Sequence, residues 1–439
     1  MFKLRSLTRN WLIKRIQANN LLYVLLLVIF ILFLIQATHE KFKPWQRRGP
    51  QHVMHSKVDS YAKTSVKFSK QDSIFEERRR RLQEVCNGKE NVFIGNNTEA
   101  NIKGRMHIDS RHKIIYCAIE KTGSTFWKRT MQILIGIRNA SNPFVIRGME
   151  AHFSFNTLRK VSFDIVHVLL QKYTKFLFVR EPYARLLSGY VDKLFSPNSF
   201  YWKYTGTYIV RYFRSLPSNH SIKCGHDVTF PEFIDYFIDS EEHNRFRNGH
   251  FTPSYDHCRP CQIQYDIIGK LESFKNDTIF ILEKLGVDSL IHFSDFAKES
   301  EIDALTDAAD NVYAMRLAVT KCMTFTEALR RVWKKMQIRG LLSREIPFPY
   351  SDDSRAYIPY STFLKTLLDA HARSGPRDKR IENRKLALIE AYRQIDYRQL
   401  LRLKRILEPD CKIFGYDPEP SIIFQQTRQP ESFYFMFDY

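Results

Sequence analysis

The chain has 439 residues, of which 44% are hydrophobic and 14% aromatic, so it has ample material for a buried core and cannot be disordered throughout. Its formal net charge of +21 favours acidic partners: nucleic acid, an anionic membrane, or a sulfated or carboxylated glycan. Which of these three partners the protein can meet depends on its cellular compartment.

An uncharged run, LLYVLLLVIFILFLIQA, occupies residues 21–37. It lies at the short end of what spans a bilayer, roughly 17 to 25 residues. Basic residues and no acidic ones precede it, so the positive-inside rule keeps residues 1–20 in the cytosol. We therefore expect a cytoplasmic tail at 1–20, a signal anchor at 21–37 and a lumenal remainder, which removes nucleic acid as a partner. A cleaved signal peptide is the alternative, although QATHEKF offers no clear cleavage site.

Sequons and cysteines fit a lumenal chain. Four N-x-[ST] sequons begin at Asn96, Asn139, Asn219 and Asn276, although such short patterns also arise by chance. In an oxidising lumen disulfides are expected, and because the chain has seven cysteines, at least one thiol is left over or pairs between chains. The sequence leaves the pairing open among Cys86, Cys117, Cys224, Cys258, Cys261, Cys322 and Cys411.

The stretch 38–107 is polar and without sustained periodicity, so we expect it to form a lumenal stem. Within it, FEERRRRLQEV (75–85) predicts one short charged helix with a solvated face, binding of an acidic glycan being the alternative. The globular pattern occupies 108–420, which we expect to be one folded domain. Residues 421–439 are expected to form a C-terminal tail.

Two strand-turn-helix units follow one another in the globular part. The predicted strands are HKIIYCAI (112–119) and KFLFVR (175–180), and the predicted helices are TFWKRTMQILIGI (125–137) and ARLLSGYVDKLF (184–195). Repeated units of this kind indicate an α/β fold with a central parallel sheet flanked by helices, and ligands at the carboxyl ends of the strands. Further helices are predicted at 229–238, at 274–287 and repeatedly between about 300 and 400.

The first turn, KTGST, has residue types that suit an anion. A helix N-terminus presents unpaired N–H groups and the positive end of the helix dipole. Gly123 allows close approach of the backbone, Ser124 and Thr125 add hydroxyl donors, and Lys121 adds a positive charge. The nucleotide pattern G-x-x-x-x-G-K-[ST] is absent because the lysine precedes the glycine, which argues against an ATPase or kinase. Taken alone, KTGST is more typical of an ordinary connection.

The second turn adds a second set of anion ligands. VREPYARLLSGY places Arg180 at a strand end and Ser188 inside the following helix, where both could reach a second phosphate on the same ligand. Arginine suits this role because its planar fork binds phosphate oxygens bidentately. The alternative is that Arg180 pairs with a nearby carboxylate and Ser188 faces solvent.

Several ordered blocks together resemble one family. KTGSTFWKR after a strand, KFLFVREPYARLLSGYVDKL, TFPEFIDYF, GHFTPSYDHCRPCQIQYDIIGKLESFKND and RILEPDCKIFGYDPEP resemble the Golgi carbohydrate sulfotransferases, in the group that includes chondroitin and dermatan 4-O-sulfotransferases. The similarity covers most of 110–295 and roughly 385–420. It implies a P-loop-like sulfotransferase fold, a type II Golgi membrane topology, and 3′-phosphoadenosine 5′-phosphosulfate as sulfate donor.

The resemblance also implies roles for the residues of the two turns. Lys121, Thr122, Gly123, Ser124 and Thr125 would cradle the 5′-phosphosulfate, and Arg180 and Ser188 would hold the 3′-phosphate. Phe126, Trp127 and Lys128 match family positions as well, with core packing as the alternative for Trp127.

The expected chemistry is attack of a sugar hydroxyl on sulfur, which drives negative charge onto the bridging oxygen. A lysine ammonium stabilises that charge without a metal, and we assign Lys121 to this role. A histidine with a pKa near neutrality suits the general base. The candidates are His152, which lies between the two turns in the sequence, and His250 in NGHFTP, and either histidine could instead be structural.

Three departures from the family pattern bear on activity. Glu120 stands where proline is usual, and an acidic group beside a phosphate site is unfavourable unless it points away or pairs with a basic neighbour. Ser124 replaces a common cysteine, and the region 300–385 is longer than expected. Separately, Cys258 and Cys261 with Cys224 and His226 offer a zinc ligand set, although disulfides are favoured in a lumen.

These observations favour a Golgi enzyme that transfers sulfate to an acidic glycan, most specifically to the 4-hydroxyl of GalNAc in chondroitin or dermatan, and a homodimer is compatible with them. A catalytically silent, membrane-anchored glycan-binding protein with the same fold is the alternative that Glu120 keeps open. A lumenal kinase is disfavoured because the nucleotide motif is missing.

Overall fold

The structure is a computed structural model that describes residues 58–88, 93, 95–153, 156–351, 357–425 and 433–435, with side chains from residue 70 onward. The predicted cytoplasmic tail and signal anchor lie outside the described residues. Among the residues described, no helix has the length and apolar character needed to cross a membrane. Residues Ser65–Tyr439 form one compact unit, and all that follows lies within it.

A four-stranded sheet lies inside this unit, in the order β1-β2-β3-β4. Its strands are β1 (Met106–Asp109), β2 (Ile114–Cys117), β3 (Thr174–Val179) and β4 (Ile267–Lys270). β2, β3 and β4 are parallel, as predicted, whereas β1 is antiparallel to β2. The expectation of a parallel sheet is therefore corrected at this edge. The four residues between β1 and β2 can join only antiparallel neighbours, because a parallel pair needs a long crossover.

Both predicted strand-turn-helix units are confirmed. β2 leads into α4 (Ser124–Leu134), and β3 leads into α6 (Pro182–Tyr190), which continues as a π-helical turn over Val191–Phe195. Because β2 and β3 are parallel, both turns open at the same edge of the sheet. The predicted helices near 229 and 274 are α10 (Phe230–Glu242) and α12 (Phe274–Lys284).

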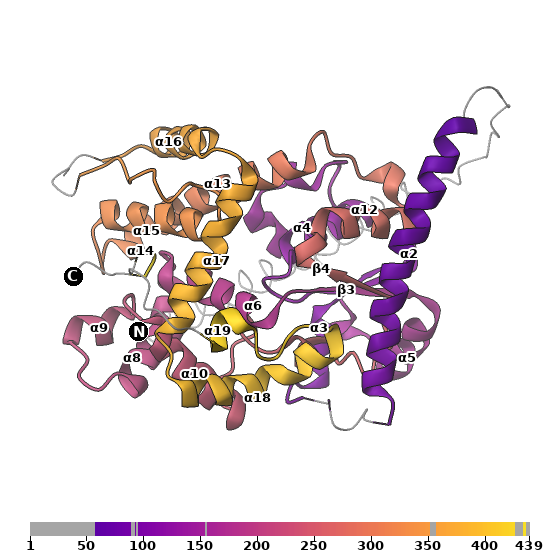
Figure 1. Cartoon of the computed structure of the whole chain (residues 1–439), viewed down its shortest axis with the longest axis horizontal. Helices are drawn as coiled ribbons and strands as arrows, with labels where there is room; N and C mark the ends of the chain where they lie inside the picture. Colours follow the sequence, from indigo (N-terminus) through magenta and orange to yellow (C-terminus); the bar gives the residue numbers. More distant parts are fainter. Residues whose placement is uncertain are drawn as a thin grey trace, which may run out of the picture. The chain divides into compact units, whose positions relative to one another are not determined.

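Helices cover both faces of the sheet, because alternate residues of each strand point to opposite sides (Figure 1). Tyr116, Phe176 and Phe178 form one face and share a core cluster with residues of α4 and α12. Cys117, Leu177 and Val179 form the other face. The helices on that second side are α3 (Glu99–Arg105), α5 (Phe163–Lys172), α11 (Ser254–Cys258) and the end of α18 (Tyr397–Phe414).

The predicted helical region after residue 295 is confirmed and forms two further cores. One contains residues of α6, α10, α17 and α18, and the other contains residues of α13, α15 and α16. The bounds are α13 (Phe296–Ala314), α14 (Arg316–Val319), α15 (Phe325–Ile338), α16 (Tyr360–Arg373), α17 (Arg377–Arg393) and α19 (Ser421–Phe424). Between α6 and α10 lie the short helices α7 (Ser199–Tyr201), α8 (Thr207–Phe213) and α9 (Asn219–Cys224).

The folded unit begins within α2 (Val58–Cys86), which corrects the expected boundary at residue 108. Phe75 is buried and stacks on Phe280 of α12. Arg78, in the middle of the basic run, donates to the buried Asp277 at 2.6 Å. One side of this helix is therefore packed, because its apolar positions recur at helical spacing between the charges.

The C-terminal segment is also partly packed, which corrects its description as a tail. Ile423 of α19 is buried, and so is Tyr434. The carboxylate of Glu390 on α17 accepts hydrogen bonds from the backbone N–H groups of Phe433, Tyr434 and Phe435.

Three disulfides are present, as expected for an oxidising compartment. They join Cys86 to Cys261, Cys117 to Cys258, and Cys224 to Cys322. Cys411 is the remaining cysteine, buried as a thiol. The zinc alternative is overturned, because both cysteines of CRPC are paired with partners elsewhere in the chain.

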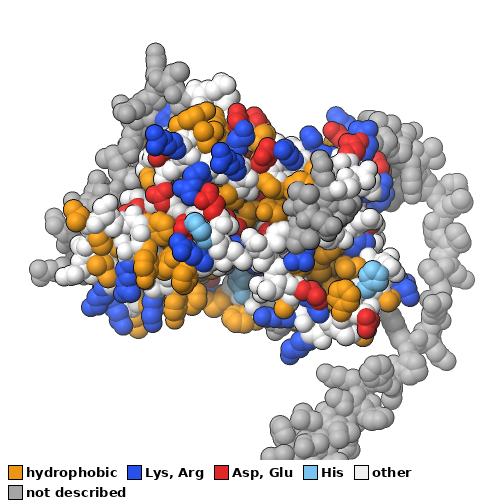
Figure 2. Space-filling view, turned by 90° about the horizontal axis from the view of Figure 1, so that it is seen from below, with side chains coloured by type: hydrophobic (Ala, Val, Ile, Leu, Met, Phe, Trp, Pro, Cys, Tyr) orange, Lys and Arg blue, Asp and Glu red, His pale blue; other side chains and the backbone are white. Residues whose placement is uncertain are grey.

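The surface fits both glycosylation and acidic ligands. The asparagines of all four sequons are exposed. On the face seen from below, Lys and Arg side chains are scattered widely, with sparser Asp and Glu among them (Figure 2).

Candidate active site

The turn between β2 and α4 is shaped for close approach of a ligand to its backbone. Gly123 caps α4 with φ of 86°, and an added Cβ would lie 2.5 Å from the ring of Phe274. Only glycine fits there. Lys121 is also left-handed, with φ of 69°. No side chain caps α4, so the N–H groups of its first turn, from Ser124 onward, have no helical partner and can serve an anion.

Some residues predicted to bind the donor have other tasks. The buried Thr122 hydroxyl donates to the carbonyl of Ile119 at 2.8 Å, which closes the turn. The side chains of Phe126 and Trp127 are buried, and Trp127 packs against Phe176 at 4.6 Å between ring centroids. These three side chains therefore face the turn or the core, and a part for these positions in donor binding stays a prediction. At the start of α4, Ser124 and Thr125 are half-buried, as is Lys128 one turn further along.

The two predicted turns are joined to each other by guanidinium groups. Arg180 at the end of β3 donates from Nη1 to the carbonyl of Lys121 at 3.5 Å. Arg185 on α6 donates from Nε to the carbonyl of Glu120 at 3.0 Å. The Nη2 atom of Arg185 is buried and has no hydrogen-bond partner within the described part of the chain. A buried donor left in this state fits a site that takes an anionic ligand.

Three ammonium groups surround one carboxylate beside the first turn. Asp192 lies 2.9 Å from Nζ of Lys121, 3.2 Å from Nζ of Lys193 and 2.6 Å from Nζ of Lys335. We call these four residues the lysine cluster. Asp192 and Lys193 come from the π-helical turn after α6, whereas Lys335 comes from α15. The cluster carries excess positive charge when its lysines are protonated.

The pKa of Lys121 is shifted by its burial and by these neighbouring charges. This pKa is lowered to about 7, mainly by burial; Asp192 acts in the opposite direction, and the neighbouring Lys193 and Lys335 contribute to the lowering. The pKa of Asp192 is held well below its usual range by the same lysines, despite its burial. A bound anion would supply the missing negative charge and raise the pKa of Lys121, so the residues present fit a phosphosulfate.

We expect donor-site affinity to fall as the pH rises through 7, because the Lys121 ammonium then loses its proton. The measurement is calorimetric titration with adenosine 3′,5′-bisphosphate between pH 6 and pH 8, comparing the wild type with Lys121→Arg. The guanidinium of the Lys121→Arg variant stays charged over this pH range, and any ionisation of the ligand affects both proteins equally. We therefore expect the affinity of the wild type to fall more steeply with pH than that of the variant. Identical pH dependence in the two proteins would contradict this prediction.

The Asp192→Asn variant is expected to move that fall to lower pH. Asp192 is the group that raises the pKa of Lys121, so its neutralisation leaves only burial and like charges, which lower it. The same titration series measures the midpoint, and Asp192→Glu, which keeps the charge, is the matched control. An unchanged midpoint in Asp192→Asn would show that Asp192 does not control the Lys121 ammonium.

The second predicted anion site depends on side chains, because the N-terminus of α6 is occupied. The Glu181 carboxylate accepts from the N–H groups of Tyr183 and Ala184 at 3.0 and 2.6 Å. Burial lowers the pKa of Arg384 to about 10, and the nearby guanidinium groups of Arg180 and Arg339 contribute. A group of arginines therefore lies at the end of β3. Ser188 is half-buried on α6.

Both candidate bases are neutral imidazoles. Burial lowers the pKa of His250 to about 3, with Lys193 contributing. For His152, whose side chain is open to solvent, partial desolvation and the nearby Lys128 and Lys193 lower the pKa. The expected near-neutral pKa is therefore corrected for the protein without ligand. The Tyr201 hydroxyl lies 2.8 Å from Nδ1 of His250, which orients that ring. His152 is exposed.

Glu120 is paired, so it does not oppose an anion at the turn. Its carboxylate accepts from Nη1 of Arg105 at 2.6 Å and lies 3.6 Å from Nε2 of His257. Burial by itself would raise the pKa of Glu120, but Arg105 holds it well below the usual range. The main reason to expect an inactive protein is thereby removed.

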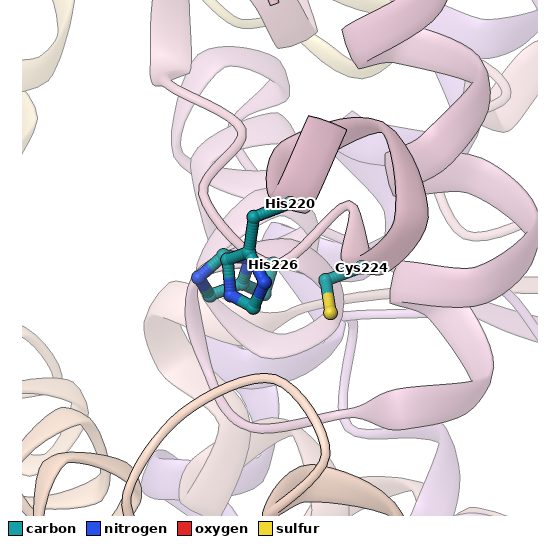
Figure 3. A group of neighbouring side chains, drawn as sticks. All are labelled: His220, Cys224 and His226. Atoms are coloured by element: carbon teal, nitrogen blue, oxygen red, sulfur yellow. The ribbon is translucent and has the colours of Figure 1, made fainter. Parts of the chain in front are cut away.

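His220, Cys224 and His226 lie within 4.8 Å of one another by their ligand atoms (Figure 3). The Cys224 sulfur is bonded to Cys322, and Nε2 of His220 lies 2.9 Å from the Cys322 carbonyl oxygen. A disulfide sulfur is not the thiolate that zinc requires, so this group is a structural contact around the disulfide.

Sequence patterns missed the partners that complete the site. Lys335 and Arg384 belong to helices far along the chain, and Arg339 directly follows one of them. In the sequence all three look like ordinary charged positions. Asp192 and Lys193 lie inside the block KFLFVREPYARLLSGYVDKL that resembles the family, a few residues after Ser188, and this position was the available signal.

Comparisons with known proteins agree with this geometry. Residues 104–336, more than half of the chain, match the model of the sulfotransferase family. The chain is 38% identical over 198 residues to carbohydrate sulfotransferase 11 of Mus musculus, covering 44% of this chain and 56% of that protein. It is 32% identical over 290 residues to carbohydrate sulfotransferase 11 of Danio rerio, covering 62% and 80%. With carbohydrate sulfotransferase 9 of Homo sapiens the identity is 32% over 244 residues, covering 55% and 54%.

The α/β fold, its two strand-turn-helix units and these matches identify a member of the sulfotransferase family. The chain belongs to the carbohydrate sulfotransferase family. The match spans about half the length of the mouse relative. No solved structure matches the chain.

Proposed function

We propose that this protein transfers sulfate from 3′-phosphoadenosine 5′-phosphosulfate to a hydroxyl of an acidic glycan, the 4-hydroxyl of GalNAc in chondroitin or dermatan chains. The observation that carries the proposal is the joining of the two turns, in which Arg180 bonds to the backbone of Lys121. A single ligand with phosphate groups at both ends suits two anion sites held side by side.

Different residues would bind the two phosphate-bearing ends of the donor. The first turn of α4, with Lys121, Ser124 and Thr125, would hold the 5′-phosphosulfate through backbone N–H groups, hydroxyls and an ammonium. Arg180 and Ser188 would hold the 3′-phosphate. The donor supplies an activated sulfuryl group, and no metal is needed because the lysine cluster supplies positive charge.

The chain's own groups perform three tasks. The Lys121 ammonium stabilises negative charge that develops on the bridging oxygen. Asp192 orients that ammonium through its contact of 2.9 Å. An imidazole, that of His250 or His152, accepts the proton of the attacking hydroxyl, since both rings are neutral and near the lysines. Anionic ligands would raise the pKa of either ring and make it a stronger base.

An acidic acceptor and a Golgi location fit the rest of the molecule. The net charge of +21 concentrates a polyanion near the protein. Three disulfides and four exposed sequon asparagines suit the lumen of the secretory pathway. We propose a single-pass type II protein anchored in the Golgi membrane through residues 21–37. Two relatives carry the name carbohydrate sulfotransferase 11, which places their substrates among carbohydrates.

The test is transfer of radiolabelled sulfate by the purified full chain to desulfated chondroitin, dermatan and heparan. We expect label in chondroitin or dermatan, and disaccharide analysis should place it at the 4-hydroxyl of GalNAc. Label confined to heparan, or at another hydroxyl, would overturn the acceptor. No transfer to any glycan and no binding of adenosine 3′,5′-bisphosphate would overturn the reaction itself.

A further inference from the structure

A groove of about 470 Å³ lies on the side of the first turn facing α3. Its size is within the range of ligand sites, about 300 to 1,000 Å³. Its walls come from α3, from the beginning of the turn that follows β2, and from α4. The groove extends to Thr252, which precedes α11. It is separate from the lysine cluster, none of whose four members lines it.

The groove continues into the proposed active site through two of its residues. Glu120 directly precedes Lys121, and Lys128 lies one helical turn after Ser124 on the same face of α4. A ligand in the groove would therefore have one end beside the turn that holds the reacting group of the donor.

Its lining is basic and rich in hydrogen-bonding groups. Arg105, Lys128, Arg159 and Arg247 face it, against the single carboxylate of Glu120. Among the described residues Arg159 makes no ion pair, and its side chain packs over Gly104, where an added Cβ would lie 3.6 Å from Cδ. Asparagine and threonine side chains, Asn101 among them, line most of the remaining wall.

This combination suits a sugar chain that carries carboxylates. Guanidinium groups bind carboxylates bidentately, and amide and hydroxyl side chains exchange hydrogen bonds with sugar hydroxyls. Arg105 and Arg247 already hold protein carboxylates, on Glu120 and on Glu241 and Asp256, whereas the exposed Arg159 is placed to meet a ligand.

We propose that this groove binds the acceptor glycan, with Arg159 on a uronate carboxylate and Asn101 on sugar hydroxyls. The inference rests on the proposed function for the identity of the glycan. It places the acceptor chain across α3 and α4.

The test is binding of an unsulfated chondroitin hexasaccharide to the purified full chain in the presence of adenosine 3′,5′-bisphosphate. We expect Arg159→Gln to weaken hexasaccharide binding about fivefold, the value of one exposed charge contact, and Asn101→Ala to weaken it further in the double variant. Affinity for the bisphosphate should stay unchanged in both. The matched control is Lys365→Gln, which removes an exposed charge from α16, outside the groove.

Unchanged hexasaccharide affinity in the double variant, or an equal loss in Lys365→Gln, would overturn the groove assignment. So would a wild type that binds the bisphosphate but not the hexasaccharide. Failure of sulfate transfer is a separate result, because both binding measurements are made without any reaction. Unchanged thermal unfolding of the variants confirms that a loss of affinity is local to the groove.

Discussion

Replacement of Lys121 by alanine is expected to lower sulfate transfer about 10²- to 10³-fold, the scale seen when one group that stabilises developing charge is removed. Lys121 lies in the turn after β2 with a left-handed backbone conformation, and its ammonium contacts Asp192 at 2.9 Å. The two other lysines of the cluster approach the same carboxylate from other elements, so they can hold an anion but do not replace the group on the turn.

The measurement is the initial rate of transfer from radiolabelled donor to chondroitin at saturating donor. Lys298→Ala is the control, because that side chain is exposed on α13. Thermal unfolding of Lys121→Ala should match the wild type within a few degrees. A variant that keeps more than a tenth of the wild-type rate would remove Lys121 from the catalytic role.

The second large effect concerns the disulfide between Cys117 and Cys258. Its removal in the Cys117→Ser/Cys258→Ser double variant is expected to lower the free energy of unfolding by about 2 to 5 kcal/mol. The bridge links residues 141 apart in sequence, so it restricts the unfolded chain strongly. Both cysteines are fully buried, and Cys117 ends the strand that leads into the active-site turn.

Urea unfolding of the variant measures this loss. Cys411→Ala is the matched control, because it removes a buried thiol from the chain without breaking a cross-link. Its loss should be smaller than that of the double variant. Equal midpoints for the double variant and the wild type would show that the bridge contributes nothing to stability.

The parts of the fold that were predictable have local causes. A buried apolar run followed by a turn and an amphipathic run defines β2–α4 and β3–α6 within a few residues of where they lie. Their parallel pairing follows from the long helical crossover between them. The antiparallel β1 was missed because it has four residues and follows a stretch without sustained periodicity.

The parts of the site that were not predictable come from distant contacts. Lys335 meets Asp192 across 143 residues of sequence, and nothing near either residue marks the pair. Burial of α2 likewise depends on contacts with α12, so a charged run that would be solvated on its own is packed on one side. The residues of the turns, by contrast, were identifiable because chain neighbours form the anion site.

The most direct test of the central claim is calorimetric binding of adenosine 3′,5′-bisphosphate and of adenosine 5′-monophosphate to the wild type and to Arg180→Ala. If the two turns hold opposite ends of one donor, the variant should lose about 10- to 100-fold in affinity for the bisphosphate, the value of hydrogen bonds to a charged group. Affinity for the monophosphate, which lacks the 3′-phosphate, should change little. Equal losses for both ligands, or no loss for either, would contradict the assignment of Arg180 to the 3′-phosphate and with it the account of the joined turns.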